Sequence, residues 1–207
     1  MKTYIVDAFT NKPFKGNPAG VCLAEKDMDP ALMLSIAQEL GLSETAFISK
    51  GENENRYAIR YFSPKMEIPL CGHATLASAK VLFNIYPSEQ IHFTTIQKLH
   101  LWIRKAGAKI MMEFPVYDTA PAAAPAALVS ALGITEIVNC EYNKETNILL
   151  LEIKDAEVLK NLRPDFEALY RSHTAVNGVL VTAASGTDGY DFHSRYFWPW
   201  SGTNEDR

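Results

Sequence analysis

The stretch "IPLCGHATLASAKVLF", residues 68 to 83, joins a strand-like segment to a helix-like segment through a tight turn. The strand-like run ends at Pro69, and the tripeptide Cys71-Gly72-His73 follows directly. A thiol and an imidazole at the start of a helix can bind a metal, act as nucleophile or move a proton. The same turn can also be a purely structural corner, so the residues around it must decide.

The helix predicted over residues 74–85 is apolar on nearly all of its sides. Its large or small apolar residues include Leu76, Ala77, Val81 and Leu82. A helix without a polar face is expected at the centre of a domain. The first backbone N–H groups of such a helix lack intrahelical acceptors, and its dipole favours a negative charge. A carboxylate is therefore a suitable ligand for this turn.

Composition restricts the class of protein. The 207 residues are 47% hydrophobic, which is enough for a sizeable core, and the net charge of -4 argues against nucleic acid as a partner. No segment is apolar enough for a signal peptide or a membrane span, which predicts a soluble, cytoplasmic protein without a membrane partner. The three cysteines, Cys22, Cys71 and Cys140, include no CxxC pair, so neither a disulfide framework nor a zinc ribbon is indicated.

Strand-like segments dominate the first half of the chain. They are "TYIVDAF", "ETAFISK", "RYAIRYF", "KMEIPL", "QIHFTTI", "LHLWIRK" and "AKIMMEFPV". A helix is predicted from Asp29 as N-cap, through Pro30 at the first helical position, to Gly41 as stop signal. The preceding stretch "TNKPFKGNPAG" is rich in turn residues and is predicted to be a loop without regular structure.

A connector rich in proline and alanine, "DTAPAAAPAA" at residues 118–127, predicts the domain organisation. The first domain is expected over residues 1–117 and the second over residues 128–207. A duplication supports this division, because "RYFSP" at 60–64 recurs as "RYFWP" at 195–199, an offset of 135. Two further pairs of element starts share this offset within one residue: Pro30 with Pro164, and Ser43 with Gly178.

Extending the offset of 135 places Asp206 opposite Cys71. The second copy would then end before its own turn and central helix, so its apolar concavity is expected to be unfilled. We therefore expect the second domain to be incomplete within these 207 residues. Its missing part would come from a homodimer partner or from a complementing C-terminal segment.

Several side chains are candidates for chemistry. Glu44 opens the apolar segment "ETAFIS", where it is either a surface residue or a buried carboxylate suited to moving a proton to and from carbon. Cys71 is either a nucleophile or a small buried apolar group. No metal site is predicted, because Cys71 and His73 supply two ligands at most and the other histidines are scattered in sequence: His92, His100, His173 and His193. No nucleotide-binding motif is present either, so no cofactor is expected.

The chain resembles the phenazine-biosynthesis isomerase (PhzF-like) family. The resemblance is carried by "DAFTNKPFKGNPAGV", "LGLSETAFIS", "IRYFSPKMEIPLCGHATLA" and "SRYFWPWSGTNED", in this order along the whole chain. It implies an α+β fold of the diaminopimelate-epimerase type. In that fold two similar domains each wrap a β-barrel-like sheet around a central helix, and the active site lies in the cleft between the domains.

The resemblance also implies roles for individual residues. Glu44, His73 and Asp206 are expected to be catalytic, with Glu44 as the proton-transferring carboxylate. Gly72, His73 and Asn17 are expected to contact the substrate. Asp206 matches the aspartate of the family motif "EDPxTGS", but Arg207 stands where the family has proline and the Thr-Gly-Ser part is absent. Half of the family's site would then be missing from these residues.

The implied function is a cofactor-independent isomerase of phenazine-type biosynthesis. It would move a proton on a small carboxylate-bearing metabolite, with Glu44 removing the proton from one carbon and returning it to another. Two alternatives stay open at this stage. One is a cysteine-dependent epimerase or racemase that uses Cys71, and the other is an inactive fragment or binding module.

Overall fold

The computed structural model describes residues 1–25, 28–51, 53–114, 116–173, 175–186, 189–201 and 203–206. The chain divides into two compact units, Met1–Pro115 and Val116–Arg207. The stretch expected to be a connector, 118–127, contains a two-residue strand and the start of a helix. Two of its alanines, Ala122 and Ala124, pack against the core of the second unit. This stretch is therefore part of the second unit, and Arg207 lies outside the described residues.

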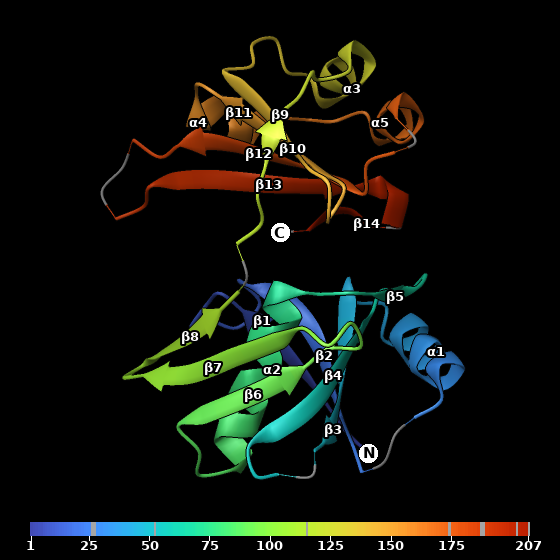
Figure 1. Ribbon diagram of the computed structural model, residues 1–207, viewed down its shortest axis with the longest axis vertical. Coiled ribbons are helices and arrows are strands. Elements are labelled where there is room, and N and C mark those ends of the chain that lie inside the picture. The colour runs from blue at the N-terminus through green and yellow to red at the C-terminus, as the bar shows by residue number, and fades with distance from the viewer. Residues whose placement is uncertain are drawn as a thin grey trace. The chain divides into compact units, whose positions relative to one another are not determined.

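The first unit is built on an eight-stranded sheet (Figure 1). Its strands are β1 (Lys2–Ala8), β2 (Asn17–Ala24), β3 (Glu44–Lys50), β4 (Arg56–Phe62), β5 (Glu67–Ile68), β6 (Gln90–Thr94), β7 (His100–Ala106) and β8 (Lys109–Glu113). They follow the order β1-β2-β3-β4-β6-β7-β8, and β5 pairs with β4. The pairs β2–β3 and β4–β6 are parallel, and the others are antiparallel.

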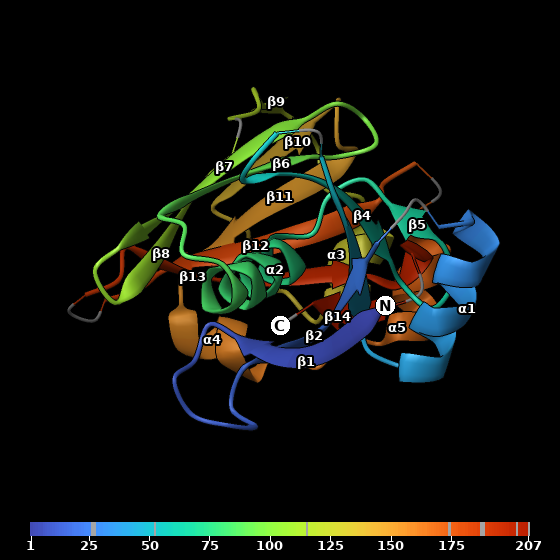
Figure 2. The same ribbon diagram turned by 90° about the horizontal axis from the view of Figure 1, so that it is seen from below.

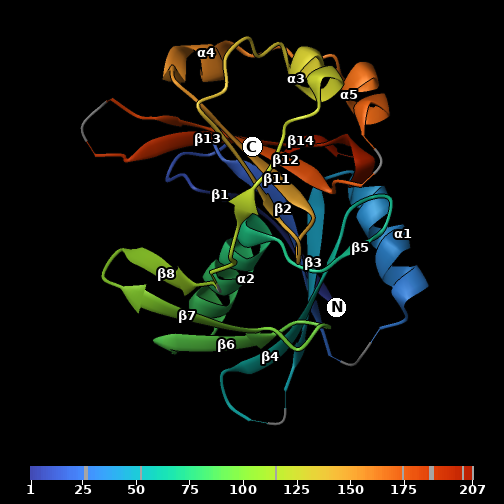
Figure 3. The same ribbon diagram turned by 45° about the horizontal axis from the view of Figure 1, so that its top comes forward.

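Helix α2 (Gly72–Ile85) lies inside the curl of this sheet (Figure 3). It contacts β1, β2, β3 and β8. Ala74 and Ala77 are fully buried, and Val81 and Leu82 are also buried. Small alanine side chains let the sheet approach the helix closely, while the larger residues fill the space between strands. The prediction of an apolar central helix in the first half is confirmed.

Helix α1 (Pro30–Leu40) covers the other face of the sheet (Figure 2). Its Met33 and Ala37 pack with residues of β2, β3 and β4 that point away from α2: Cys22, Phe47 and Phe62. Asp29 caps the helix, because its Oδ1 accepts a hydrogen bond from the Ala31 N–H at 2.8 Å. Gly41 ends the helix in the left-handed region at a φ of 63°. Both predicted end signals are confirmed.

The predicted irregular loop before α1 is wrong in its second half, because β2 already begins at Asn17. Pro18 is tolerated because it stands near the strand start, opposite Asp7 of β1. Gly20 does not interrupt the strand. A side chain at Gly20 would press on the Thr45 hydroxyl of the neighbouring strand β3, so this glycine permits close packing.

The second unit carries a six-stranded sheet in the order β14-β13-β12-β11-β10-β9. The strands are β9 (Ala120–Pro121), β10 (Asn139–Asn143), β11 (Ile148–Ile153), β12 (Gly178–Ala184), β13 (Phe192–Trp198) and β14 (Thr203–Asp206). Three helices and a 3-10 turn accompany them: α3 (Ala126–Leu132), α4 (Ala156–Asn161), α5 (Phe166–Ser172) and η1 (Pro199–Ser201). The helices gather on one face of the sheet (Figure 1).

The core of the second unit lies between these helices and the sheet. It includes Leu128, Leu169, Leu151, Val181 and Phe197, all fully buried. The pairing register places Leu150, Leu180 and Tyr196 side by side on the opposite face, where they are half-buried. That a further polypeptide segment covers this face stays a prediction.

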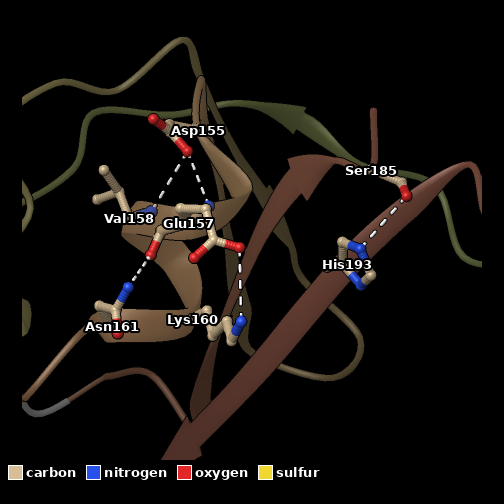
Figure 4. Close-up of polar contacts among 7 residues, drawn as sticks. All are labelled: Asp155, Glu157, Val158, Lys160, Asn161, Ser185 and His193. Atoms are coloured by element: carbon tan, nitrogen blue, oxygen red, sulfur yellow. Dashed lines mark hydrogen bonds and ion pairs between the residues drawn. The ribbon is translucent and has the colours of Figure 1, made fainter. Parts of the chain in front are cut away.

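Local polar contacts define element ends in this unit (Figure 4). Asp155 caps α4, since its Oδ1 accepts hydrogen bonds from the N–H groups of Glu157 at 2.7 Å and Val158 at 3.4 Å. Ser185 Oγ lies 3.3 Å from His193 Nε2, which ties the end of β12 to β13. No helix in the part of the chain that the structure describes has the length and apolar character needed to cross a membrane.

The predicted duplication is visible in the strand pairing. The sequence of pairings through β1, β2, β3, β4 and β5 recurs through β10, β11, β12, β13 and β14, including one parallel pair in the same place. Each copy also has an arginine–glutamate pair with two hydrogen bonds. Arg60 binds Glu67 at 2.8 and 2.7 Å, and Arg195 binds Glu205 at 2.7 and 2.8 Å.

The duplication also corrects one alignment. The offset is 135 at Arg60 and Arg195 but 138 at Glu67 and Glu205, because the second copy has three more residues between these partners. Tyr61 pairs with Ile68, whereas Tyr196 pairs with Asp206. Asp206 is therefore the counterpart of Ile68. The predicted equivalence of Asp206 and Cys71 is wrong, because it extended a constant offset across a turn of different length.

The burial of α2 predicts a clear difference between two leucines. Leu82 is 1% exposed in α2, whereas Leu32 is 52% exposed in α1. We expect Leu82→Ala to lower the free energy of unfolding by about 2–5 kcal/mol, because it leaves a cavity between helix and sheet. Leu32→Ala is the matched control and should change it by less than about 0.5 kcal/mol. Urea unfolding followed by circular dichroism measures both, and equal effects would contradict the central position of α2.

Candidate active site

Three chemically active side chains meet in the first unit. Glu44 is the first residue of β3, Cys71 is the N-cap residue of α2, and His73 is in the first turn of α2. One ligand atom from each lies within 4.8 Å of the others. Their exposed fractions are 0%, 5% and 2%. The predicted pair of Glu44 and His73 therefore lies together, and the surface alternative for Glu44 is excluded.

The shortest contact in this group joins Glu44 to His73. Glu44 Oε2 lies 3.2 Å from His73 Nε2, within the range of an ion pair. The two side chains are not oriented for a hydrogen bond. Neither Glu44 oxygen accepts a hydrogen bond from any residue that the structure describes. A buried carboxylate is normally surrounded by donors. Both oxygens of Glu44 are thus available to accept a proton.

Cys71 contacts the same imidazole. Its Sγ lies 3.4 Å from His73 Nδ1 and 4.0 Å from Nε2. His73 therefore contacts both a thiol and a carboxylate. An imidazole in this position can exchange protons with either neighbour.

A buried hydrogen-bond chain supports the turn that carries Cys71. The Thr75 hydroxyl donates to the Cys71 carbonyl oxygen at 2.6 Å, and it lies 2.6 Å from the Tyr61 hydroxyl. Because the Thr75 proton is used in the first bond, Tyr61 must be the donor in the second. Burial raises the pKa of Tyr61 well above its usual value, so the tyrosine keeps that proton. The strand β4 thereby fixes the start of α2.

The remaining predicted site residues have different positions. A side chain added at Gly72 would meet no described residue within 4 Å, so the turn has open space beside it. Asn17 is buried at the start of β2, two residues before Ala19, which pairs with Glu44 on β3. Asp206 belongs to β14 of the second unit, and its predicted part in catalysis stays a prediction.

The second unit has no carboxylate at the position of Glu44. Glu44 precedes Thr45, which pairs with Phe62, and the equivalent pair in the second unit is Val179 with Phe197. The counterpart of Glu44 is therefore Gly178. A side chain at Gly178 would overlap the Tyr196 ring, so this tyrosine fills the space. Burial, followed by the Asp206 carboxylate, raises the pKa of Tyr196.

The structure also brings together two histidines, His92 and His100, that were not predicted to lie in one site. His92 Nε2 lies 3.0 Å from His100 Nδ1, and the His92 ring stacks on Trp102 at a centroid distance of 4.1 Å. Burial, then the charge of Arg56 and the neighbouring His100, lowers the pKa of His92. The alternating pattern of the predicted strands β6 and β7 could have revealed this cluster, because the two strands form an antiparallel hairpin.

The fold and the site together define a class: an α+β protein in which a curled sheet encloses a helix whose first turn faces a buried carboxylate. The sequence profile of the PhzC-PhzF family, described as phenazine biosynthesis-like protein, matches residues 6–207. The chain belongs to this family. The predicted family and the predicted diaminopimelate-epimerase-like fold class are confirmed.

Relatives are found in animals and bacteria. Phenazine biosynthesis-like domain-containing protein 1 of Mus musculus is 37% identical over 98% of this chain and 77% of its own length. An uncharacterized isomerase of Pseudomonas aeruginosa is 40% identical over 97% of this chain and 74% of its own length. The crystal structure of a PhzF-family protein of Enterococcus faecalis has a TM-score of 0.85 and 41% identity, over 99% of this chain and 75% of that one.

The hydrogen-bond chain at the turn predicts unequal effects of two conservative substitutions. Tyr61→Phe should lower the free energy of unfolding by about 1 kcal/mol, because Thr75 keeps its bond to the Cys71 carbonyl. Thr75→Val should cost about 1–3 kcal/mol, because it leaves the buried Tyr61 hydroxyl without its acceptor. In the double variant the cost should be smaller than the sum of the two. Additive costs in urea unfolding would show that the two hydroxyls act separately.

Proposed function

We propose that the protein is a cofactor-independent isomerase in which Glu44 and His73 move a proton on a small carboxylate-bearing metabolite. Membership of the PhzC-PhzF family supports this proposal, as does the name isomerase given to bacterial relatives. The single observation that carries it is the buried contact of 3.2 Å between Glu44 Oε2 and His73 Nε2. It places two groups capable of acid–base catalysis side by side.

Glu44 acts as the base that takes a proton from carbon. Its oxygens accept no hydrogen bond from the described residues, so no donor must be displaced before they reach the substrate C–H bond. The carboxylate then holds a single proton in a position closed to water, since Glu44 is fully buried. Returning that proton to another carbon of the conjugated skeleton completes an isomerisation without net loss of a proton.

The first turn of α2 binds and orients the substrate. The first N–H groups of a helix have no acceptor within the helix, and they and the helix dipole favour a carboxylate there. Gly72 leaves room for a close approach of the substrate to the backbone. His73 then stabilises the charge that develops on the substrate when Glu44 removes the proton. Asp206 and Asn17 complete the set of residues that the family resemblance assigns to the site.

A thiol mechanism is the second candidate, because Cys71 Sγ lies 3.4 Å from His73 Nδ1. In that case His73 would take the thiol proton, and the thiolate would remove the substrate proton as in a cysteine-dependent racemase. Because Asp206 is the counterpart of Ile68, the repeat does not place a carboxylate opposite Cys71. Substituting Glu44 and Cys71 one at a time distinguishes the two mechanisms.

The carboxylate mechanism predicts a large effect of Glu44→Gln. The amide keeps the size of the side chain but cannot hold the transferred proton, so turnover should fall by about 10²–10⁴-fold. Turnover is measured by proton NMR as movement of the double bond in a panel of small unsaturated carboxylic acids. Glu39→Gln, at an exposed site of α1, is the matched control and should keep the wild-type rate.

The opposite pattern would replace the carboxylate mechanism. If Glu44→Gln kept its activity and Cys71→Ser lost it, the thiol would be the base. If the wild-type protein bound an acid of the panel but converted none, the binding-module alternative would stand, and if it bound none, the inactive-fragment alternative would stand.

Close approach of the substrate to Gly72 predicts a separation of stability from activity. Gly72→Ala should raise the free energy of unfolding by up to about 1 kcal/mol, because alanine favours helix and the added methyl meets no described residue. The same methyl should lower kcat/KM at least about tenfold, which corresponds to about 1.4 kcal/mol of lost substrate binding. Unchanged kcat/KM in a stable variant would show that the substrate does not approach this turn.

A further inference from the structure

We propose that Glu44, Cys71 and His73 form a binding site for a zinc ion. The three side chains offer a carboxylate oxygen, a sulfur and an imidazole nitrogen, and these atoms lie within 4.8 Å of one another. Oxygen, sulfur and nitrogen of these residue types are the usual protein ligands of zinc. The sequence alone pointed to two ligands at the turn. The fold adds the third, because β3 places Glu44 against the start of α2.

The Glu44 and His73 atoms have nearly the spacing of a tetrahedral ion, and the Cys71 side chain must rotate toward them to complete the site. A tetrahedral zinc ion holds its ligand atoms about 3.3–3.6 Å apart, as follows from the usual zinc–ligand bond lengths. Glu44 Oε2 and His73 Nε2 are 3.2 Å apart, and His73 Nε2 and Cys71 Sγ are 4.0 Å apart. The ion would take the place of the direct contact between Glu44 and His73. The third pair, a Glu44 oxygen and Cys71 Sγ, lies within 4.8 Å, and binding would draw the sulfur closer by rotation of the Cys71 side chain.

Charge and burial favour a divalent cation. The Cys71 thiol gives its proton to water when the sulfur binds the metal, so that thiolate and carboxylate together balance the two positive charges. Glu44 is fully buried and accepts no hydrogen bond from the described residues, and the cation would compensate its charge. The dipole of α2 opposes a cation, which makes the two anionic ligands essential. Sulfur and imidazole ligands select zinc over magnesium or calcium.

Zinc binding has a consequence for catalysis. Three protein ligands leave a fourth coordination position for water. The ion would occupy the Glu44 oxygen and the His73 nitrogen that are proposed to act on the substrate, so bound zinc should inhibit the isomerase. The inhibition rests on the proposed function, whereas the binding of zinc does not.

Cobalt titration without substrate tests the site directly. Cobalt(II) takes zinc sites and gives a thiolate-to-metal charge-transfer band in the near ultraviolet when sulfur is a ligand. The reduced wild-type protein should bind one equivalent of Co²⁺ with this band, and Zn²⁺ should displace it. The band should be absent in Cys71→Ser and present in Cys140→Ser, the matched control in the second unit. Glu44→Gln should weaken Zn²⁺ binding at least about tenfold, which corresponds to about 1.4 kcal/mol.

Far-ultraviolet circular dichroism and melting curves identify the variants that fold. If Cys71→Ser does not fold, the zinc affinity of Glu44→Gln tests the site. Absence of the band in the wild-type protein would overturn the proposal. A band that persisted in Cys71→Ser, or equal zinc affinity in Glu44→Gln and wild type, would do the same. Because these readouts need no substrate, they test zinc binding independently of the proposed isomerase activity. Either proposal can be contradicted while the other stands.

Discussion

The burial of α2 inside the curled sheet is the packing on which both the core and the site of the first unit depend. The helix is buried along nearly its whole length, and its alanines allow the surrounding strands to approach closely. Burial of the helix fixes the position of its first turn. That turn is held further by the Tyr61–Thr75 hydrogen bond and carries Cys71 and His73 to the start of β3. The site is therefore a consequence of the same packing that stabilises the unit.

The duplicated units share a strand pattern but not a chemistry. Each has a parallel strand pair followed by two antiparallel pairings and an arginine–glutamate pair. At the position of Glu44, however, the second unit has Gly178, and the Tyr196 ring occupies the space of the missing side chain. One copy of the repeat thus keeps a buried carboxylate, while the other uses the same position for packing. A duplicated fold can in this way divide stability and chemistry between its halves.

Much of the fold could be predicted because its signals are local. Asp29 and Gly41 mark the ends of α1, and the apolar pattern after Gly72 marks a buried helix. The start of β2 at Asn17 was missed, because glycine and proline signal a break unless the close neighbour β3 is known. The equivalence of Asp206 also failed, because the extra residues between Arg195 and Glu205 shift the register.

The contact of Glu44 with His73 could be expected only from the family resemblance, since no local pattern places β3 beside the start of α2. The measurement that tests this pair most directly is a single turnover, in ordinary water, of a substrate deuterated at the carbon that loses its proton. Glu44 is fully buried and holds one hydron at a time, so part of the deuterium should reappear at the new position in the product. A product that carries hydrogen from the solvent alone would contradict it.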